Sequence, residues 1–452
     1  MSFARYPAYK DSCVEWLGEV PGHWGVKPIK HIGQLQGGAG FPHAEQGIEG
    51  EELQFHKVNA LAKADTDGKL TDGENSISRA TASRLGASIF PAGTLVFAKV
   101  GAALLLARIR ELAMPSCIDN NMMGLMVNTE TFETNFVRYA MTLVRFDLIA
   151  NPGAVPSLNE SQIGDYKLAI PAPKEQQAIA TFLDTETAKI DGLMAEQRAL
   201  VALLKEKRQA VISHAVTKGM NPAAPMKDSG VAWLGEVPGH WEVKRIKHLT
   251  SSFEQGWSPQ CEGFPVESEN EWGVLKVGCV NGGTFRPEEN KTLPAELEPI
   301  PALRISAGDL LISHANTREL VGSTAVATRD YSNLLLCDKL YRARFHKGVC
   351  EPMFIGLYLG TNMARSQIEL AATGASSSMV NIGQSIILEM DLGLPTFVEQ
   401  HAIVEFINHQ TAQLDTLTQE AQTAIALLQE RRTALISAAV TGKMDVRAAM
   451  TA

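Results

Sequence analysis

Two long segments of this chain occur twice, and this internal duplication limits the possible folds more than any other feature of the sequence. Residues 11–32 recur at 228–249 with 17 identities in 22 positions, at an offset of 217 residues. Residues 171–217 recur at 395–441 with 22 identities in 47 positions, at an offset of 224 residues. The 452-residue chain therefore has two halves with one plan: a short motif, a less similar region and a long repeated block.

The less similar regions are residues 33–170 and 250–394. Each contains apolar segments interrupted by glycine, which predicts short strands joined by turns, and each continues into amphipathic helical segments. Because these features follow in the same order in both halves, we expect both regions to share one α+β fold despite their weak identity.

The long repeated blocks predict long helices. Pro171 and Pro173 lie at the start of the first block, and Gly219 and Gly442 follow the two blocks, as expected for helix starts and ends. The predicted seam has the alternating four- and three-residue steps of a coiled coil and comprises Ile179, Leu183, Glu186, Ile190, Leu193, Gln197, Leu200, Leu204, Lys207 and Val211 in the first block and Ile403, Ile407, Gln410, Leu414, Leu417, Ala421, Ala424, Leu428, Arg431 and Leu435 in the second.

A helix with such a narrow apolar stripe is only marginally stable alone in water, so it needs a partner. The other copy is the nearest candidate, and a pseudo-two-fold relation between the halves would pair the two helices antiparallel. The alternative, in which each helix packs only on its own domain, fits poorly with a length of about 60 Å. The sequence predicts an α+β fold class, with two α+β domains at 1–170 and 221–394 and a pair of long antiparallel helices at 171–220 and 395–446.

The composition narrows the class of protein. Lys and Arg number 41 and Asp and Glu number 50, a formal charge of −9, which argues against a free-standing, non-specific nucleic-acid binder. The six cysteines are scattered without C-x-x-C spacing, so we predict reduced thiols and neither a metal site nor a disulfide framework. The chain does not open on a signal-peptide segment, and no stretch approaches the ~20 apolar residues of a membrane span, which predicts a cytoplasmic protein.

Motifs of common enzyme classes are missing from the sequence. It contains no G-x-x-x-x-G-K-[ST] phosphate loop, no G-x-G-x-x-G, no H-E-x-x-H and no G-x-S-x-G. His23 and His240 recur within P-G-H-W, but no base or nucleophile recurs with them, so we expect these Trp/His turns to anchor the entry to each domain. No catalytic residue is predicted, and we expect a chain that is not an enzyme by itself.

Several motifs carry a family resemblance. These are W-L-G-E-V-P-x-H-W, G-D-L-L-I-S-H-A-N-T-R-E-L-V-G at 308–322, E-Q-x-A-I, and L-L-x-E-x-R-x-A-L-I-S. Over residues 11–444 the chain resembles the specificity subunits of type I restriction–modification systems. The first half departs from this pattern, because FAKVGAALLLARI stands where the second half has A-N-T-R-E, so we expect its reading loop to be built differently.

The resemblance implies a role and partners. Each domain would be a target-recognition domain that reads one half of an interrupted double-stranded DNA site, with the paired helices setting the spacing. Two modification (methyltransferase) subunits would dock on the chain and bind S-adenosylmethionine, so that this chain itself holds no cofactor. Restriction subunits, whose presence the sequence leaves open, would bind ATP and Mg.

Residues that combine base-edge hydrogen-bonding groups with a loop position are candidate DNA contacts. They are Lys57, Asn59, Lys99, Asn120 and Asn121 in the first domain, and Lys276, Asn281, His314, Asn316, Thr317, Arg318, Lys339, Arg342, Arg344, Ser376, Ser377 and Ser378 in the second. Lys57 and Lys276 are predicted on K-V strands, and Lys339, Arg342 and Arg344 on one face of another strand. For each residue the alternative is an ordinary surface or turn position, such as a turn cap at Asn120 and Asn121.

The repeated E-x-R predicts a docking site for the modification subunits at Glu206, Arg208, Glu430 and Arg432, with a solvated helix face as the alternative. Two other functions compete with DNA recognition. A coiled-coil adaptor with two protein-binding domains would suit the negative charge, whereas an enzyme with its own methyltransferase or nuclease is disfavoured by the missing motifs.

Overall fold

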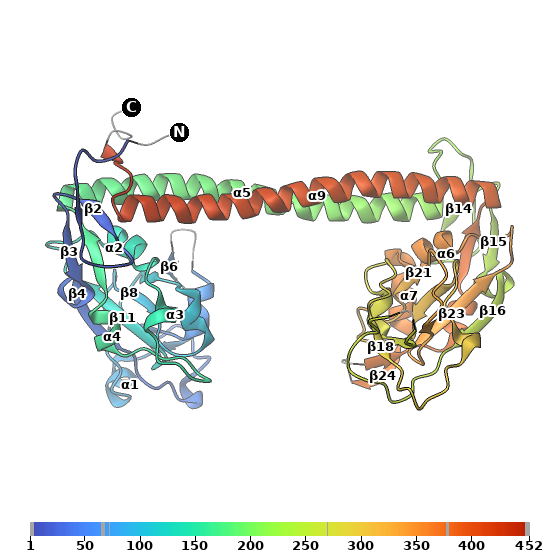
Figure 1. Cartoon of the computed structure of the whole chain (residues 1–452), viewed down its shortest axis with the longest axis horizontal. Coiled ribbons are helices and arrows are strands. Elements are labelled where there is room, and N and C mark those ends of the chain that lie inside the picture. The colour runs from blue at the N-terminus through green and yellow to red at the C-terminus, as the bar shows by residue number, and fades with distance from the viewer. Residues whose placement is uncertain (1–3, 65–67, 72, 269, 377–378, 448–452) are drawn as a thin grey trace. The chain divides into compact units, whose positions relative to one another are not determined.

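The computed structural model of the chain describes residues 4–64, 68–71, 73–268, 270–376 and 379–447. It divides into two compact units, one formed by Met1–Arg198 with Thr423–Ala452 and the other by Ala199–Gln422 (Figure 1). Each unit contains one α+β domain and one end of each long helix, so the helices are shared between the units. The boundaries predicted from the sequence, which separate helices from domains, stay a prediction.

A five-stranded sheet forms the centre of the first domain. Its order is β4 (Gly33–Gly37), β11 (Met122–Val127), β8 (Leu95–Ala98), β9 (Arg110–Leu112) and β6 (Lys69–Leu70). Neighbouring strands are antiparallel except β6 and β9, which are parallel. Alternate residues of β8 enter two cores, because side chains of a strand point to opposite faces. Leu95 and Phe97 pack in the core that contains helix α2 (Thr134–Met141), whereas Val96 and Ala98 pack in a second core on the other face.

The second domain repeats this topology. Its main sheet has the order β16 (Thr250–Gln255), β23 (Leu340–Phe345), β19 (Leu310–Ser313) and β21 (Thr324–Val326), all antiparallel. A smaller three-stranded sheet beside it also recurs, as β10 (Ser116–Ile118), β5 (Leu53–His56) and β7 (Ser76–Ile77) in the first domain and β22 (Leu334–Leu335), β17 (Gly273–Leu275) and β18 (Asn290–Thr292) in the second. In both, the middle strand has one parallel and one antiparallel neighbour. The predicted shared α+β fold is confirmed.

The remaining elements are short. In the first unit they are α1 (Arg79–Arg84), α3 (Phe146–Ile149), α4 (Glu160–Gly164), and the 3-10 helices η1 (Ile29–His31), η2 (His43–Glu45), η3 (Val58–Ala62) and η4 (Ala102–Leu106). In the second they are β20 (Ala315–Asn316), β24 (Thr373–Ser376), β25 (Met379–Asn381), α6 (Pro352–Leu359), α7 (Asn362–Ala371), α8 (Gln384–Leu388), η5 (Ile246–His248), η6 (Val277–Val280) and η7 (Pro301–Leu303).

The repeated short motif forms a frame at the entry to each domain. In the first half it comprises β1 (Tyr9–Asp11), β2 (Glu19–Pro21) and β3 (Gly25–Pro28), which pairs with β12 (Lys167–Ile170); in the second half it comprises β13 (Met226–Asp228), β14 (Glu236–Pro238) and β15 (Glu242–Arg245), which pairs with β26 (Asp391–Leu394). Trp24 and Trp241, from the P-G-H-W turns, are fully buried in the two main cores.

Each Trp/His turn contacts the first turn of the long helix in its own half. His23 Nε2 lies 2.9 Å from a carboxylate oxygen of Glu175, and His240 Nε2 lies 3.0 Å from Glu399. The Trp241 indole also donates a hydrogen bond to Glu399, at 3.1 Å. These contacts confirm the expected anchoring role of the turns. A carboxylate in the first turn of a helix is also favoured by the helix dipole.

The long helices are α5 (Pro173–Lys218) and α9 (Phe397–Val440), and glycines of positive φ, Gly219 and Gly442, follow them. In the first unit, Arg432 Nε lies 2.9 Å from Asp191 Oδ1, and its Nη2 lies 3.2 Å from Oδ2. In the second unit, Arg208 Nε lies 2.9 Å from Asp415 Oδ1.

These two ion pairs are related by the 224-residue repeat, because Asp191 corresponds to Asp415 and Arg208 to Arg432. In each unit, the core residues that follow the ion-paired residue on one helix pack with the core residues that precede the ion-paired residue on the other helix. The segments of α5 and α9 within each unit are therefore antiparallel, as predicted.

Every second position of the predicted seam is wrong by one residue from Glu186 in the first helix and from Gln410 in the second, whereas Ile179 and Ile403 are buried as predicted. Leu193 and Leu417 are each 47% exposed, whereas Thr187, Met194 and Thr411 are buried. The prediction followed leucines, but the packed stripe accepts threonine, whose hydroxyl bonds to a carbonyl one turn earlier, as Thr187 does to Leu183 at 2.7 Å. The steps of four and three residues remain, in a shifted phase.

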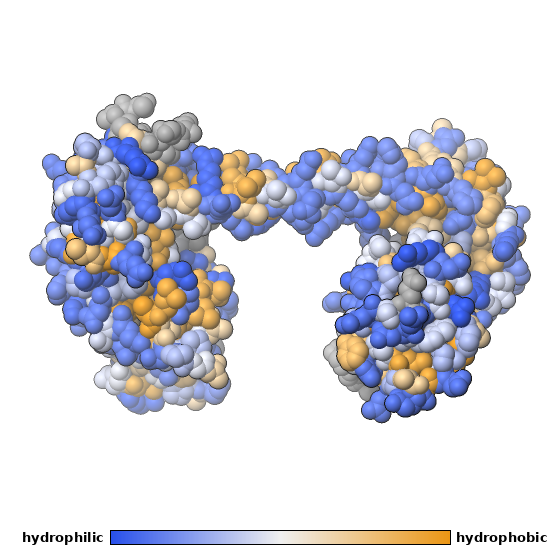
Figure 2. Space-filling view, viewed as in Figure 1, coloured by the Kyte–Doolittle hydropathy of each residue, from blue (hydrophilic) through white to orange (hydrophobic). Residues whose placement is uncertain are grey.

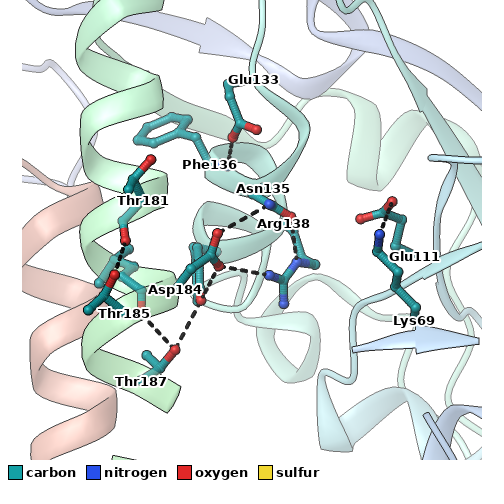
Figure 3. Close-up of polar contacts among 12 residues, drawn as sticks. Lys69, Glu111, Glu133, Asn135, Phe136, Arg138, Thr181, Asp184, Thr185 and Thr187 are labelled. Carbon is teal, nitrogen blue, oxygen red and sulfur yellow. Dashed lines mark hydrogen bonds and ion pairs between the residues drawn. The ribbon is translucent and has the colours of Figure 1, made fainter. Parts of the chain in front are cut away.

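A polar cluster in the first unit joins the domain to its helical segment. The Asp184 carboxylate on α5 accepts hydrogen bonds from Tyr139 Oη at 2.8 Å and from Arg138 Nη2 and Asn135 Nδ2 at 3.3 Å each, all on α2 (Figure 3). Tyr139 Oη also lies 3.1 Å from the Thr187 hydroxyl, so two successive turns of α5 hold α2. This cluster fixes the domain on the helix within this unit.

Candidate nucleic-acid interface

The loops of the second domain bring several predicted contact residues together. Asn316 Nδ2 donates to Asn281 Oδ1 at 3.3 Å, which links β20 to the end of η6. The imidazole of His314 stacks on the Tyr341 ring, with centroids 4.4 Å apart, and His314 Nε2 contacts the Asp338 carbonyl oxygen. These residues come from three segments far apart in the sequence and lie near the end of β19 and the start of β23, which are paired.

A glycine makes this convergence possible in each domain. A Cβ at Gly256, directly after β16, would overlap the carbonyl oxygen of Leu336, and a Cβ at Gly38, directly after β4, would overlap that of Asp119. Only glycine lets the chain after the edge strand cross so close to the segment that precedes the next strand. The sequence analysis missed these two residues, although their separation of 218 residues lies close to the offset of the repeat.

Lys276 and Lys339 lie next to this loop cluster and are half-buried. Lys276 directly follows β17 and caps η6, and Lys57 likewise follows β5 and caps η3. Both lysines were predicted to lie within strands. This prediction is wrong by one residue, because each strand ends just before its lysine. Asn59 is exposed on η3.

Arg342 and Arg344 lie on one face of β23, as predicted, but Lys339 precedes the strand and Arg342 is buried. Arg342 is 1% exposed and its guanidinium contacts the carboxylates of Glu254 and Asp309. Arg344 Nε lies 2.6 Å from Asp309 Oδ1, and this ion pair raises the pKa of Arg344. Arg342 has no exposed surface for DNA, and the buried Asp309 ties both arginines to the sheet.

The other predicted residues of the second domain differ in exposure. Thr317 and Arg318 are exposed, and Arg318 Nη1 donates to the carbonyl oxygen of Glu369 at 3.1 Å. Ser376 ends β24, while Ser377 and Ser378 lie outside the described residues.

In the first domain, Lys99 follows β8 and its backbone N–H donates to the Asn121 carbonyl at 2.8 Å, so Lys99 and Asn121 are neighbours. Asn120 is exposed between β10 and β11. The turn here is capped by Asp119, whose Oδ1 accepts from the Asn121 N–H at 3.0 Å. Burial raises the pKa of the Asp119 carboxyl.

The first domain is apolar where the second has A-N-T-R-E. Residues 102–106 form η4, in which Leu105 and Leu106 are 52% and 56% exposed. Leu148 of the neighbouring α3 is 70% exposed, and Figure 2 shows an apolar patch on this unit where Figure 1 labels α3. The expected difference between the two loops is confirmed.

The repeated E-x-R residues divide into two kinds. Arg208 and Arg432 form the ion pairs between α5 and α9 described above, so their first role is internal. Glu206 and Glu430 are exposed. Docking at these four residues stays a prediction, and the partners Asp191 and Asp415, which the sequence analysis missed, recur at the same 224-residue offset.

Two kinds of feature are absent from the described part of the chain. Within it, no cluster of three or more His, Cys, Asp or Glu side chains could hold a metal ion. No helix there is both long and apolar enough to cross a membrane.

Comparison with known proteins identifies relatives of one kind. The chain is 27% identical over 225 residues to the type I restriction enzyme EcoEI specificity subunit of Escherichia coli, which covers 50% of this chain and 38% of that protein. It is 23% identical over 320 residues to the EcoKI specificity subunit of E. coli K12, which covers 70% of this chain and 66% of that protein. The chain is similar in sequence to type I restriction enzyme specificity subunits.

A solved structure shares the fold of this chain. A chain from a solved structure on complex assembly and conformational transition of the type I R-M system matches with a TM-score of 0.66 and 16% identity, over 93% of this chain and 98% of that one. No protein-family model matches the chain. The aligned regions span less than two thirds of the length of the two specificity subunits compared above. The resemblance predicted from the sequence is confirmed by these matches.

Proposed function

We propose that this chain is the DNA sequence-specificity subunit of a type I restriction–modification system. Each α+β domain reads one half of an interrupted double-stranded DNA site. One observation carries the proposal. The same frame surrounds two domains of one topology, and the two domains present different side chains at the corresponding loop. The polar loop of the second domain and the apolar η4 loop of the first then read different half-sites.

The long helices hold the two readers at a set spacing in this proposal. Half-sites read from one face of a duplex lie about one helical turn apart, about 34 Å, and a stiff connection favours one spacing over others. Two modification subunits dock on the chain and bind S-adenosylmethionine, while restriction subunits, where present, bind ATP and Mg. The chain supplies sequence choice rather than catalysis, in the cytoplasm where its DNA substrate lies.

The charge of the domains determines how DNA binding is shared. Residues 33–170 carry 11 basic and 15 acidic residues, and residues 250–394 carry 11 and 17, so neither domain is basic. Affinity for a duplex depends mainly on neutralised phosphates. The modification subunits must therefore supply much of this neutralisation, and the chain alone binds DNA weakly.

A salt-dependent binding assay with a randomised duplex tests the proposal. We expect the chain with its modification subunit to bind at least about tenfold more tightly than the chain alone, with a steeper dependence on salt. Lys99→Ala in the complex should reduce the salt slope by about one, whereas Lys10→Ala, on exposed β1, should leave it unchanged. Equal affinity with and without the partner would contradict the proposed division.

The competing function is a coiled-coil adaptor with two protein-binding domains, which the negative charge of both domains favours. The same assay separates the two. If the chain is an adaptor, it binds no duplex alone, and Lys99→Ala leaves the salt slope of the complex unchanged, because the chain does not contact DNA.

A further inference from the structure

The second domain contains a cavity beside the loop cluster described above. It has a volume of about 360 Å³ and opens between the segments 258–261, 274–277 and 337–339, with Lys291 of β18 at its wall. Three lysines, Lys276, Lys291 and Lys339, line it. We call this cavity the lysine pocket.

The three lysine amines of this pocket have no partner within the described chain. None of them has an ion-pair or hydrogen-bond partner among the residues that the structure describes, whereas Lys244 and Lys247 of the same unit contact Glu242 and Glu389. Three unpaired cations around one cavity create a positive potential that favours an anion such as a phosphate group.

The pocket also has a second pole. Asp338 lines it, and Asp338 Oδ1 is buried with no hydrogen-bond partner within the described chain. A buried acceptor left without a donor costs about 1–3 kcal/mol, so a ligand that donates an N–H to this carboxylate, once the side chain turns toward the cavity, is favoured. A bare phosphate would be repelled by this carboxylate, so the ligand needs an anionic end and a separate donor end.

The rest of the lining is partly apolar. It includes Pro259, Val274 and Val277, which suits a flat heterocyclic ring. An anion, a ring and an N–H donor on the ring edge are the three parts of a nucleoside phosphate.

The first domain shows that the fold does not require this cavity. By strand pairing, Phe55 corresponds to Val274, and its ring stacks on Phe41 with centroids 3.9 Å apart. Lys57, which corresponds to Lys276, donates to Gln46 Oε1 at 2.8 Å. The same place is filled and internally paired in one domain, and open with unpaired lysines in the other.

We infer that the lysine pocket binds a nucleoside phosphate, with the phosphate on the three lysines, the base against Pro259 and Val274, and a base N–H donated to Asp338. The ligand has two possible sources, a nucleotide unit of the bound DNA or a free nucleotide. The first rests on the proposed function, whereas the second does not.

Equilibrium binding of 2′-deoxyadenosine 5′-monophosphate to the full chain tests the inference. We expect Lys276→Ala combined with Lys339→Ala to weaken binding at least about tenfold, which is 1.4 kcal/mol. Lys347→Ala, an exposed lysine of the same domain outside the pocket, should bind as the wild type does. Equal binding by the wild type and the double variant, or no binding by the wild type, would overturn the inference.

Asp338→Asn separates a nucleotide site from a simple anion site. It removes a negative charge, so a site for phosphate alone should bind 2′-deoxyribose 5-phosphate and the nucleotide more tightly. If Asp338 accepts from the base, the variant should bind the nucleotide less tightly while its affinity for the sugar phosphate does not fall. Equal affinity of the wild type for the sugar phosphate and the nucleotide would contradict the base contact.

Competition with a randomised duplex, measured on the complex with the modification subunit, identifies the source. Displacement of the duplex by the nucleotide, lost in the Lys276/Lys339 double variant, assigns the pocket to DNA. Nucleotide binding that leaves the duplex in place assigns it to a free nucleotide. If no duplex binds, the proposed function fails while the nucleotide measurement still tests the pocket.

Discussion

Asp184→Ala tests how the first domain is fixed to its helix. The strongest bond lost is that from Tyr139 Oη, at 2.8 Å, and a hydrogen bond to a charged group contributes about 1.5–3 kcal/mol. The bonds from Arg138 and Asn135 are both 3.3 Å long and add little. Asp184 is 42% exposed, and Tyr139 keeps the Thr187 hydroxyl as a partner, so we expect a total cost near the lower limit, about 2 kcal/mol.

Native-state hydrogen exchange of residues 134–141 is the appropriate measurement, because it reports opening of α2 without requiring the whole chain to unfold in one step. A cost of 2 kcal/mol corresponds to about 30-fold faster exchange. Asn408→Ala is the matched control, since Asn408 occupies the corresponding repeat position on α9 and is exposed. Tyr139→Phe should reproduce most of the effect, because it removes the same hydroxyl.

The reasoning would be refuted if Asp184→Ala exchanged no faster than Asn408→Ala. It would also be refuted if Tyr139→Phe and Asp184→Ala added fully in the double variant, because two residues that act through one hydrogen bond should not be additive.

Three further predictions follow from packing, burial and charge. Gly256→Ala should destabilise the second unit by about 3 kcal/mol in urea unfolding, since backbone must move to admit a Cβ, whereas Gly263→Ala, where nothing lies within 4 Å, should not. Arg208→Ala should cost only about 0.5 kcal/mol in the same assay, because its ion pair with α9 is partly exposed and screened; a loss of several kcal/mol would mean that this pair does more than join two solvated helices. Burial raises the pKa of the Cys337 thiol to about 12, so at pH 8 it is protonated, and iodoacetamide should modify exposed Cys13 while Cys337 reacts only after denaturation.

The repeat predicted the architecture well because it reports on the whole chain at once. Two copies of one frame require two similar domains and two similar helices, and helix ends at Gly219 and Gly442 follow from local chemistry. The phase of the seam was not predictable from apolarity alone, since threonines occupy packed positions and leucines such as Leu193 remain exposed.

The candidate site was predictable as a set of loops but not residue by residue. Arg342 and exposed arginines such as Arg318 look alike in a sequence, yet Arg342 is enclosed by Asp309 and Glu254 from other strands. Such partners come from long-range strand pairing, which a spacing pattern within one strand does not contain. The lysine pocket depends on the same long-range information.

Exchange of one domain tests the central claim most directly. A chain in which residues 250–394 replace residues 33–170 would carry two copies of the second reader on an unchanged frame. Expressed with the modification subunit, and followed by sequencing of methylated genomic DNA, it should methylate a site in which one half is an inverted copy of the other and the second half is the same as for the natural chain. A motif identical to that of the natural chain, or one altered in both halves, would contradict the account.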